Sequence, residues 1–238
     1  KNPMLIMDDC DMDLAVAHSC NAAFGGTGQK CTAASRLIVH RNVLGEFTER
    51  LVQATEALRV GHALAEGTQI GPVVSEGQLA ANLTWVERGR TDGAELLTVG
   101  QRLERPTQGH YMAPAVFAGT RNDMAMNREE MFAPITCIIP VDSYSEALAV
   151  ANDTPFGLGS GVFTQNLSRA HRVSARLKAG ICWVNTYRAI SPIAPFGGYN
   201  QSGYGREAGL DAIHDYTRTK TTWINTSDSP MANPFVMR

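Results

Sequence analysis

The stretch PITCIIPVDSYSEALAVAN, residues 134–152, decides the fold of this chain. Its first half, residues 134–141, is an apolar run that predicts a buried β-strand. Ser143 and Glu146 follow at the spacing of a capping box, which predicts a helix through Asn152. A strand followed directly by a helix is the repeating unit of α/β proteins.

The same alternation continues on both sides of this stretch. Apolar, strand-length runs occupy residues 3–7, 37–39, 96–99, 162–163 and 181–184. Helices are predicted for residues 13–24 with Asp13 as the cap, from residue 42, for residues 76–90, and for residues 167–177 with Gly180 as the closing glycine. Helices of this size between strands predict an α/β fold with a mostly parallel sheet flanked by helices. Residues 216–225 are rich in threonine and predict one further, extended strand.

The composition favours a protein with a sizeable core and excludes several classes of partner. Hydrophobic residues make up 44% and charged residues 18% of the 238 residues. The net charge of −2 and the lack of a basic run argue against nucleic acid as a partner. Apolar stretches of strand length, with no signal peptide, argue against a membrane span. The chain begins at Lys1 without an initiator methionine, which indicates a part of a larger protein or a processed chain.

Five cysteines are present, at positions 10, 20, 31, 137 and 182. An odd, sparse set without a Cys-x-x-Cys pair predicts neither a disulfide framework nor a zinc site. We therefore expect no metal centre and a reducing, cytoplasmic setting. The six histidines have no partners that the sequence identifies, so we expect surface or core roles for them.

The segment from Gly25 to Arg36 reads GGTGQKCTAASR and holds the most informative cysteine, Cys31. A glycine-rich turn brings backbone amides close to a ligand, and a thiolate is a strong nucleophile. An isolated cysteine is most often an inert core residue. Its surroundings decide between these two interpretations.

Those surroundings resemble the active-site cysteine motif of the NAD(P)-dependent aldehyde dehydrogenase superfamily. Three further segments match the family's motifs in the same order, and Lys1 lines up with the lysine that closes the family's Glu-Leu-Gly-Gly-Lys motif. The three are residues 129–134 (EEMFAP), residues 152–158 (NDTPFGL) and residues 195–203 (PFGGYNQSG). Ala133 stands where the family usually has glycine, a mild change if its φ angle is negative. Four motifs in order are a far stronger signal than any one of them.

The resemblance implies the roles of three residues. Cys31 would be the catalytic nucleophile, and its backbone N–H would contribute to the oxyanion hole. Glu130 would hydrogen-bond the nicotinamide ribose of NAD or NADP, and Phe132 would pack near the nicotinamide ring. Without the motif, a solvated charge and a core aromatic would be the better interpretations of Glu130 and Phe132. Arg188 is expected near the substrate entrance, either paired with a substrate carboxylate or simply exposed to solvent.

The resemblance also implies what the chain lacks. In the family, the general-base glutamate and the Rossmann-like cofactor domain lie upstream of the position of Lys1, and no dinucleotide-binding glycine motif occurs here. We therefore expect a catalytic domain at residues 1–212, an oligomerisation strand at residues 213–225 and a flexible tail at residues 226–238. The expected partners are a small aldehyde and further copies of the chain, with little activity in the chain alone. The alternatives are acylation of coenzyme A in place of hydrolysis, or a non-catalytic oligomerising or binding fragment.

Overall fold

The computed structural model describes residues 1–236 and is built around a seven-stranded sheet of order β3-β6-β7-β2-β1-β8-β9. Only the β3–β6 pair is antiparallel, so the sheet is mostly parallel, as predicted. The seven strands are β1 (Pro3–Ile6), β2 (Arg36–His40), β3 (Glu95–Leu96), β6 (Ala115–Ala118), β7 (Ile135–Val141), β8 (Gly159–Phe163) and β9 (Ile181–Val184).

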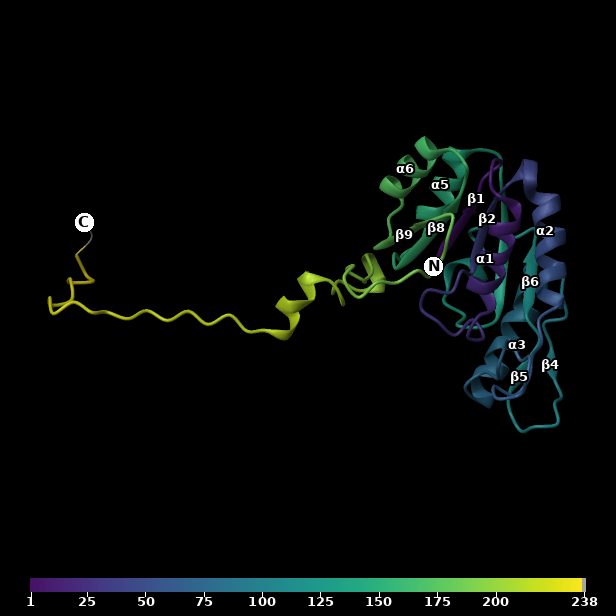
Figure 1. Ribbon diagram of the computed structural model, residues 1–238, viewed down its shortest axis with the longest axis horizontal. Coiled ribbons are helices and arrows are strands. Elements are labelled where there is room, and N and C mark those ends of the chain that lie inside the picture. Colours follow the sequence, from purple (N-terminus) through teal and green to yellow (C-terminus); the bar gives the residue numbers. More distant parts are fainter. Residues whose placement is uncertain (237–238) are drawn as a thin grey trace.

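Helices cover both faces of the sheet (Figure 1). On one face lie α1 (Met12–Phe24) and α2 (Arg41–Glu56), and on the other lie α5 (Tyr144–Asn152) and α6 (Leu167–Arg176). Successive side chains of a strand point to opposite faces, so Met4 and Ile6 pack with α1 while Leu5 packs with α5 and α6. Burial on both faces explains the continuous apolar strands of the sequence.

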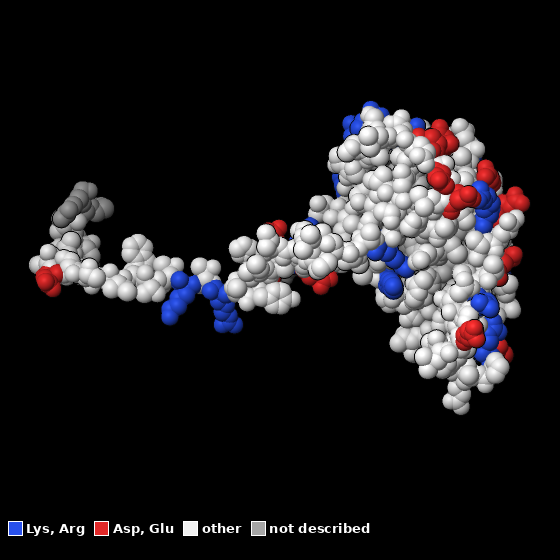
Figure 2. Space-filling view, viewed as in Figure 1, with Lys and Arg blue, Asp and Glu red and all other residues white. Residues whose placement is uncertain are grey.

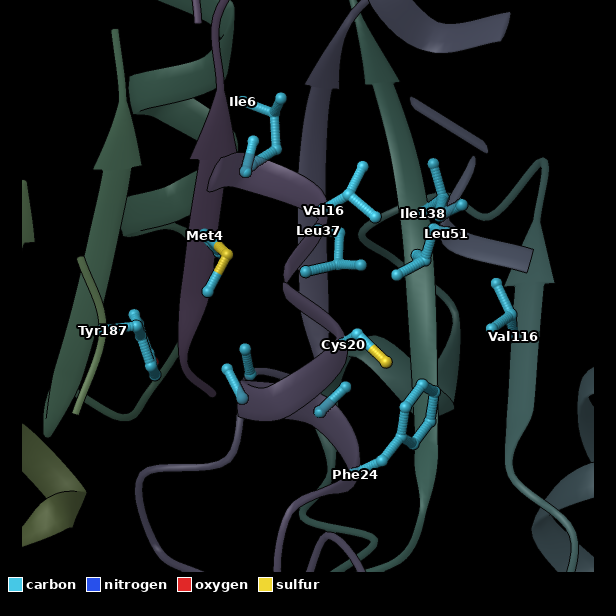
Figure 3. Close-up of a cluster of buried hydrophobic side chains, with 14 of the residues drawn as sticks. Met4, Ile6, Val16, Cys20, Phe24, Leu37, Leu51, Val116, Ile138 and Tyr187 are labelled. Atoms are coloured by element: carbon cyan, nitrogen blue, oxygen red, sulfur yellow. The ribbon is translucent and has the colours of Figure 1, made fainter. Parts of the chain in front are cut away.

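The core beneath α1 and α2 is made of closely packed aliphatic and aromatic side chains (Figure 3). Phe24 at the end of α1 and Leu51 of α2 lie beside Leu37 and Ile138 of the two central strands. The segment leading to Cys31 begins where α1 ends, at Gly25, whose backbone leaves the helical conformation.

A smaller arm extends from the β3 edge of the sheet (Figure 1). It contains α3 (Glu76–Thr91) and a two-stranded sheet of β4 (Arg102–Leu103) and β5 (Tyr111–Met112). Glu76, in the first turn of α3, binds both Arg102 and His110, with carboxylate contacts of 2.8 to 2.9 Å. The short helix α4 (Ala125–Arg128) leads from this side of the molecule towards β7.

Most predicted elements are found, with corrections at their ends. Asp11, not Asp13, caps α1, because the Asp11 carboxylate accepts a hydrogen bond from the Leu14 N–H at 3.0 Å. Ser143 caps α5 as predicted, and the Glu146 carboxylate accepts from the backbone N–H of Asp142. The strand expected at residues 96–99 is only Glu95–Leu96.

Gly180 is not the closing glycine of α6, because the helix ends at Arg176 and Leu177 is already extended. Gly180 is needed for another reason. A Cβ atom there would lie 1.8 Å from the carbonyl oxygen of Gly197, so only glycine lets these two segments touch.

The strand predicted for residues 216–225 is not formed within this chain. Residues Asn200–Ser202 and Leu210–Tyr216 are short 3₁₀ helices, and from Thr217 the backbone runs away from the sheet, exposed to solvent and without a β partner in the described part of the chain (Figure 1). The last two residues of the tail predicted for 226–238 lie outside the described residues.

Arg36, the first residue of β2, is the largest fully buried side chain of the fold. Its guanidinium donates to the carbonyl oxygens of Lys1, Val150 and Ala151 and to the side-chain oxygen of Asn122, over 2.7 to 3.1 Å. Burial lowers the pKa of Arg36 to about 10, so the group stays charged at neutral pH. One cation therefore ties the starts of β1 and β2 to the carboxyl end of α5.

Replacing Arg36 with methionine is expected to destabilise the chain severely. The substitution leaves the buried carbonyl oxygens of Lys1 and Ala151 without a donor, and losing charged hydrogen bonds of this kind costs about 3 kcal/mol or more. Urea unfolding would measure the change, with Arg41→Met as the control, because Arg41 forms only an exposed ion pair with Asp142. Equal effects of the two substitutions would contradict this account of Arg36.

Candidate active site

A pocket of about 260 Å³ lies at the amino ends of four adjacent strands, β7, β2, β1 and β8. Almost every lining residue precedes or begins one of these strands. The lining consists of Lys1, Asn2, Gly28, Lys30, Cys31, Ala33, Ser35, Glu130, Met131, Phe132, Ala133, Ile135, Phe156, Leu158, Gln201 and Ser202. All three predicted site residues, Cys31, Glu130 and Phe132, are in this set.

Cys31 lies within a tight turn between α1 and β2. The backbone N–H of Ala33 donates to the carbonyl oxygen of Lys30 at 2.9 Å, so Cys31 and Thr32 are the two central residues of the turn. Cys31 is exposed, and its backbone N–H donates to no other group among residues 1–236. Thiol and amide are therefore both available to a ligand in the pocket.

The remaining four cysteines are less accessible than Cys31. Cys20 and Cys137 are buried and Cys10 and Cys182 half-buried. Burial raises the pKa of each of these thiols, to about 11 for Cys10 and about 12 for Cys137. These four thiols therefore carry little thiolate at neutral pH.

The cysteine turn and the segment of residues 129–134 touch through a glycine. Gly28 has a φ angle of +66°, and a Cβ atom there would lie 2.0 Å from the carbonyl oxygen of Ala133. Only glycine permits this approach. Ala133 itself is not among the residues with positive φ, so the replacement of the family's glycine by alanine is tolerated.

Glu130 and Phe132 differ in how they are held. Glu130 is exposed and forms no hydrogen bond or ion pair with the described residues, whereas its neighbour Glu129 contacts Arg88 at 3.5 Å. Phe132 has a φ angle of +52°, which is rare for a bulky residue, and 39% of it is exposed. Gln78 of α3 donates towards the Phe132 carbonyl oxygen at 3.3 Å and holds this unusual backbone.

The two remaining motifs also meet at the pocket. The hydroxyl of Ser202 accepts a hydrogen bond from the Gly157 N–H at 3.0 Å, and the N–H of Gln201 donates to the Pro155 carbonyl oxygen at 3.0 Å. Residues 152–158 and 195–203 are therefore joined to one another, and Phe156, Leu158, Gln201 and Ser202 from them line the pocket together with Phe132. All four motifs found in the sequence converge here.

Sequence reasoning missed two residues that hold the site. Asn2 donates to the carbonyl oxygens of Cys31 and Ala33, and Gln78 supports Phe132. Neither lies in a motif that we identified, and no pattern in the sequence pairs residue 2 with residue 31. Their roles depend on contacts between segments far apart in the chain.

Arg188 is not the plain solvent-exposed arginine that the sequence allowed. It is half-buried, and its guanidinium donates to the carbonyl oxygens of Asn21 and Ala22 at the end of α1, at 3.1 and 2.7 Å. It is not among the lining residues of the pocket, and pairing with a substrate carboxylate stays a prediction.

Comparison with known proteins identifies the family. The model of the aldehyde dehydrogenase family matches residues 1–222. The chain belongs to the aldehyde dehydrogenase family. Among curated relatives, a betaine aldehyde dehydrogenase of Brucella anthropi is 39% identical over 234 residues, 97% of this chain and 48% of the relative. A (Z)-2-((N-methylformamido)methylene)-5-hydroxybutyrolactone dehydrogenase of Acinetobacter baylyi is 40% identical over 239 residues, 100% of this chain and 49% of the relative.

Solved aldehyde dehydrogenase structures share the fold. An indole-3-acetaldehyde dehydrogenase with NAD⁺ has a TM-score of 0.90 at 38% identity, covering 94% of this chain and 45% of its own. The NAD⁺ complex of a Bacillus cereus aldehyde dehydrogenase has a TM-score of 0.91 at 36% identity, covering 95% and 46%. The chain spans about half the length of the aldehyde dehydrogenases it matches.

Two features are absent from the part of the chain that the structure describes. No group of three or more His, Cys, Asp and Glu side chains is arranged to hold a metal ion there. None of the helices in residues 1–236 has the length and apolarity needed to cross a membrane. Positive and negative side chains are interspersed over the visible face of the folded part (Figure 2).

The side chain of Lys1 adds an unusual cation to the pocket. Lys1 is 8% exposed, and burial lowers the pKa of its ammonium group from 10.5 to about 8. Below pH 8 the folded chain holds a buried charge, whereas between pH 8 and 10.5 only the unfolded chain keeps the proton. The unfolding free energy therefore rises with pH across this window.

Lys1→Met is accordingly expected to raise the unfolding free energy at pH 7, by up to about 3 kcal/mol. The advantage should shrink between pH 8 and 10.5, where wild-type Lys1 loses its burial cost. Denaturant unfolding of both proteins at several pH values measures it, with the exposed Lys178→Met as the control. A difference that stays constant over this range would contradict the assigned cause.

Proposed function

We propose that this chain is the portion of an aldehyde dehydrogenase that carries the catalytic nucleophile, Cys31, and the nicotinamide end of the cofactor site. The observation that carries the proposal is the convergence of four separate motifs on one pocket around an exposed thiol. The reaction is oxidation of a small aldehyde to a carboxylic acid with NAD or NADP.

The covalent steps of the reaction use the thiol and the backbone N–H of Cys31 at the turn. The Cys31 thiolate attacks the aldehyde carbon and forms a thiohemiacetal, and the unengaged N–H of Cys31 donates to the oxyanion. Loss of hydride from that carbon leaves a thioester on Cys31. Water then cleaves the thioester, which releases the acid and restores the thiol.

The residues beside Cys31 fit the nicotinamide end of a dinucleotide. The carboxylate of Glu130 has no partner among the described residues and is free to accept hydrogen bonds from a ribose. The partly exposed ring of Phe132 provides an apolar surface, and its backbone is fixed by Gln78. Bound NAD or NADP would supply the acceptor for the hydride.

The rest of the machinery is proposed to lie outside this chain. The general-base glutamate and the main cofactor-binding domain belong to the portion of the family that precedes the position of Lys1. General-base assistance contributes about 10²–10⁴-fold to rate, so the chain alone should oxidise aldehydes negligibly. The relatives are named for chemically different compounds, betaine aldehyde, a substituted hydroxybutyrolactone and indole-3-acetaldehyde, and the proposal therefore names the substrate only as an aldehyde.

Cys31→Ala in the full-length protein is expected to abolish aldehyde oxidation, with a loss of several powers of ten in kcat. The reason is the loss of the only group that forms the covalent intermediate. NADH or NADPH formation measures the rate, and Cys10→Ala, which removes a half-buried thiol outside the pocket, is the matched control. Near-normal turnover of the Cys31 variant would refute the proposal.

We propose further that the segment after Ala212 joins copies of the chain into a homo-oligomer. Its large apolar residues are exposed, with Tyr216 at 85%, Trp223 at 93% and Ile224 at 80%. Residues 217–225 are β-prone and have no strand partner among residues 1–236. Exposed apolar residues on an unpaired, β-prone segment favour pairing with another copy.

Truncation after Ala212 is expected to produce a smaller assembly. Analytical ultracentrifugation of the truncated and intact forms gives the number of copies in each. A control that replaces only Ser227 to Ser229, in the polar part of the segment, should leave the assembly unchanged. The same number of copies with and without the segment would rule out this role.

A further inference from the structure

The cysteine turn is held by the buried side-chain amide of Asn2. The side-chain nitrogen of Asn2 donates to the carbonyl oxygen of Cys31 at 2.7 Å and to that of Ala33 at 2.9 Å. Its side-chain oxygen accepts from the Gly159 N–H at 3.2 Å. Both N–H donors of the amide and one acceptor site are therefore used.

The polarity of these contacts requires an amide. Two carbonyl oxygens face one end of the side chain and a backbone N–H faces the other. An aspartate would place carboxylate oxygens against the oxygens of Cys31 and Ala33, and it has no proton to donate. Asn2 is 8% exposed, so a carbonyl that lost its donor here would be poorly compensated by water.

The backbone of Asn2 is itself fixed at the sheet. Pro3 follows Asn2 and favours an extended conformation for it. The carbonyl oxygen of Asn2 accepts from the Arg36 N–H at 3.4 Å, and Gly159 is the first residue of β8. Asn2 therefore connects the turn to β1, β2 and β8 and fixes its position relative to these strands.

The consequence for Cys31 is geometric. The turn already has a hydrogen bond from Ala33 N–H to Lys30 carbonyl oxygen, which leaves the central peptide units free to rotate. Fixing the carbonyl directions of Cys31 and Ala33 removes that freedom. The thiol and the N–H of Cys31 are then presented to the pocket in one arrangement.

We infer that Asn2 is a positioning residue for the nucleophile, one that fixes Cys31 and its oxyanion-binding N–H relative to the sheet. This inference rests on the proposed role of Cys31. Asn2 lines the pocket but acts through the Cys31 turn, without any part in the covalent chemistry.

The chain contains a matched control. Asn185, directly after β9, donates to the Thr164 carbonyl oxygen at 2.9 Å and accepts from the Thr164 N–H at 2.9 Å. It is likewise an amide that bridges two backbone groups. It lies at the carboxyl ends of β8 and β9, whereas Cys31 lies at the amino ends of the strands.

The test compares Asn2→Asp with Asn185→Asp in two measurements. Hydrogen exchange on this chain reports the Ala33 N–H of the turn, and we expect it to lose protection in Asn2→Asp alone. In the full-length protein, kcat should fall by at least about tenfold in Asn2→Asp, since a misplacement of 1 Å costs on the order of 10²-fold. The dissociation constant for NAD or NADP should stay at the wild-type value.

Asn2→Ser keeps one short donor and should show intermediate losses in both measurements, which covers the case in which the aspartate variant does not fold. Unchanged protection and unchanged kcat in the Asn2 variants would overturn the inference. It would also be overturned if the Asn185 variant, at equal stability, lost as much kcat. The exchange result is independent of catalysis, so failure of the proposed function would appear separately, as an active Cys31→Ala enzyme.

Discussion

The buried guanidinium of Arg36 is the interaction on which the rest of the structure depends. It joins the start of β1, the start of β2 and the carboxyl end of α5 through hydrogen bonds to the carbonyl oxygens of Lys1, Val150 and Ala151. The turn that carries Cys31 ends directly before β2, and the loop that carries Phe156 begins directly after α5. Because one cation fixes both the start of β2 and the end of α5, the two loops attached there reach the same pocket.

The position of the pocket explains why arginines are needed around it. Ligands of parallel α/β sheets usually bind at the carboxyl ends of the strands, whereas this pocket lies at the amino ends. Helices that precede strands therefore end here, and a helix carboxyl end carries a partial negative charge. Arg188 binds the carbonyl oxygens at the end of α1, and Arg36 binds those at the end of α5. These two cations offset the partial negative charges of the two helix ends.

The sequence was sufficient for the α/β class and for three residues that line the pocket, because both depend on local patterns. Periodicity identified α2, the capping box identified α5, and the order of the motifs predicted that Cys31, Glu130 and Phe132 would belong to one site. The sequence did not reveal the roles of Asn2 and Gln78. Both donate to backbone carbonyl oxygens, which have no sequence signature, and these acceptors lie 29 and 54 residues away. Gly180 was assigned to the wrong contact for the same reason, because its neighbour Gly197 is distant in the chain. The segment after Tyr216 could not be judged locally, because a strand forms only where a partner exists.

The central claim is that Cys31 forms the covalent bond to the aldehyde. Rapid-quench mass spectrometry of the full-length protein, mixed with an aldehyde substrate and NAD or NADP, tests it most directly. The account predicts that the peptide containing Cys31 gains the mass of the acyl group during turnover and loses it as the acid is released. An acyl group on any other residue, or turnover without modification of Cys31, would contradict the account.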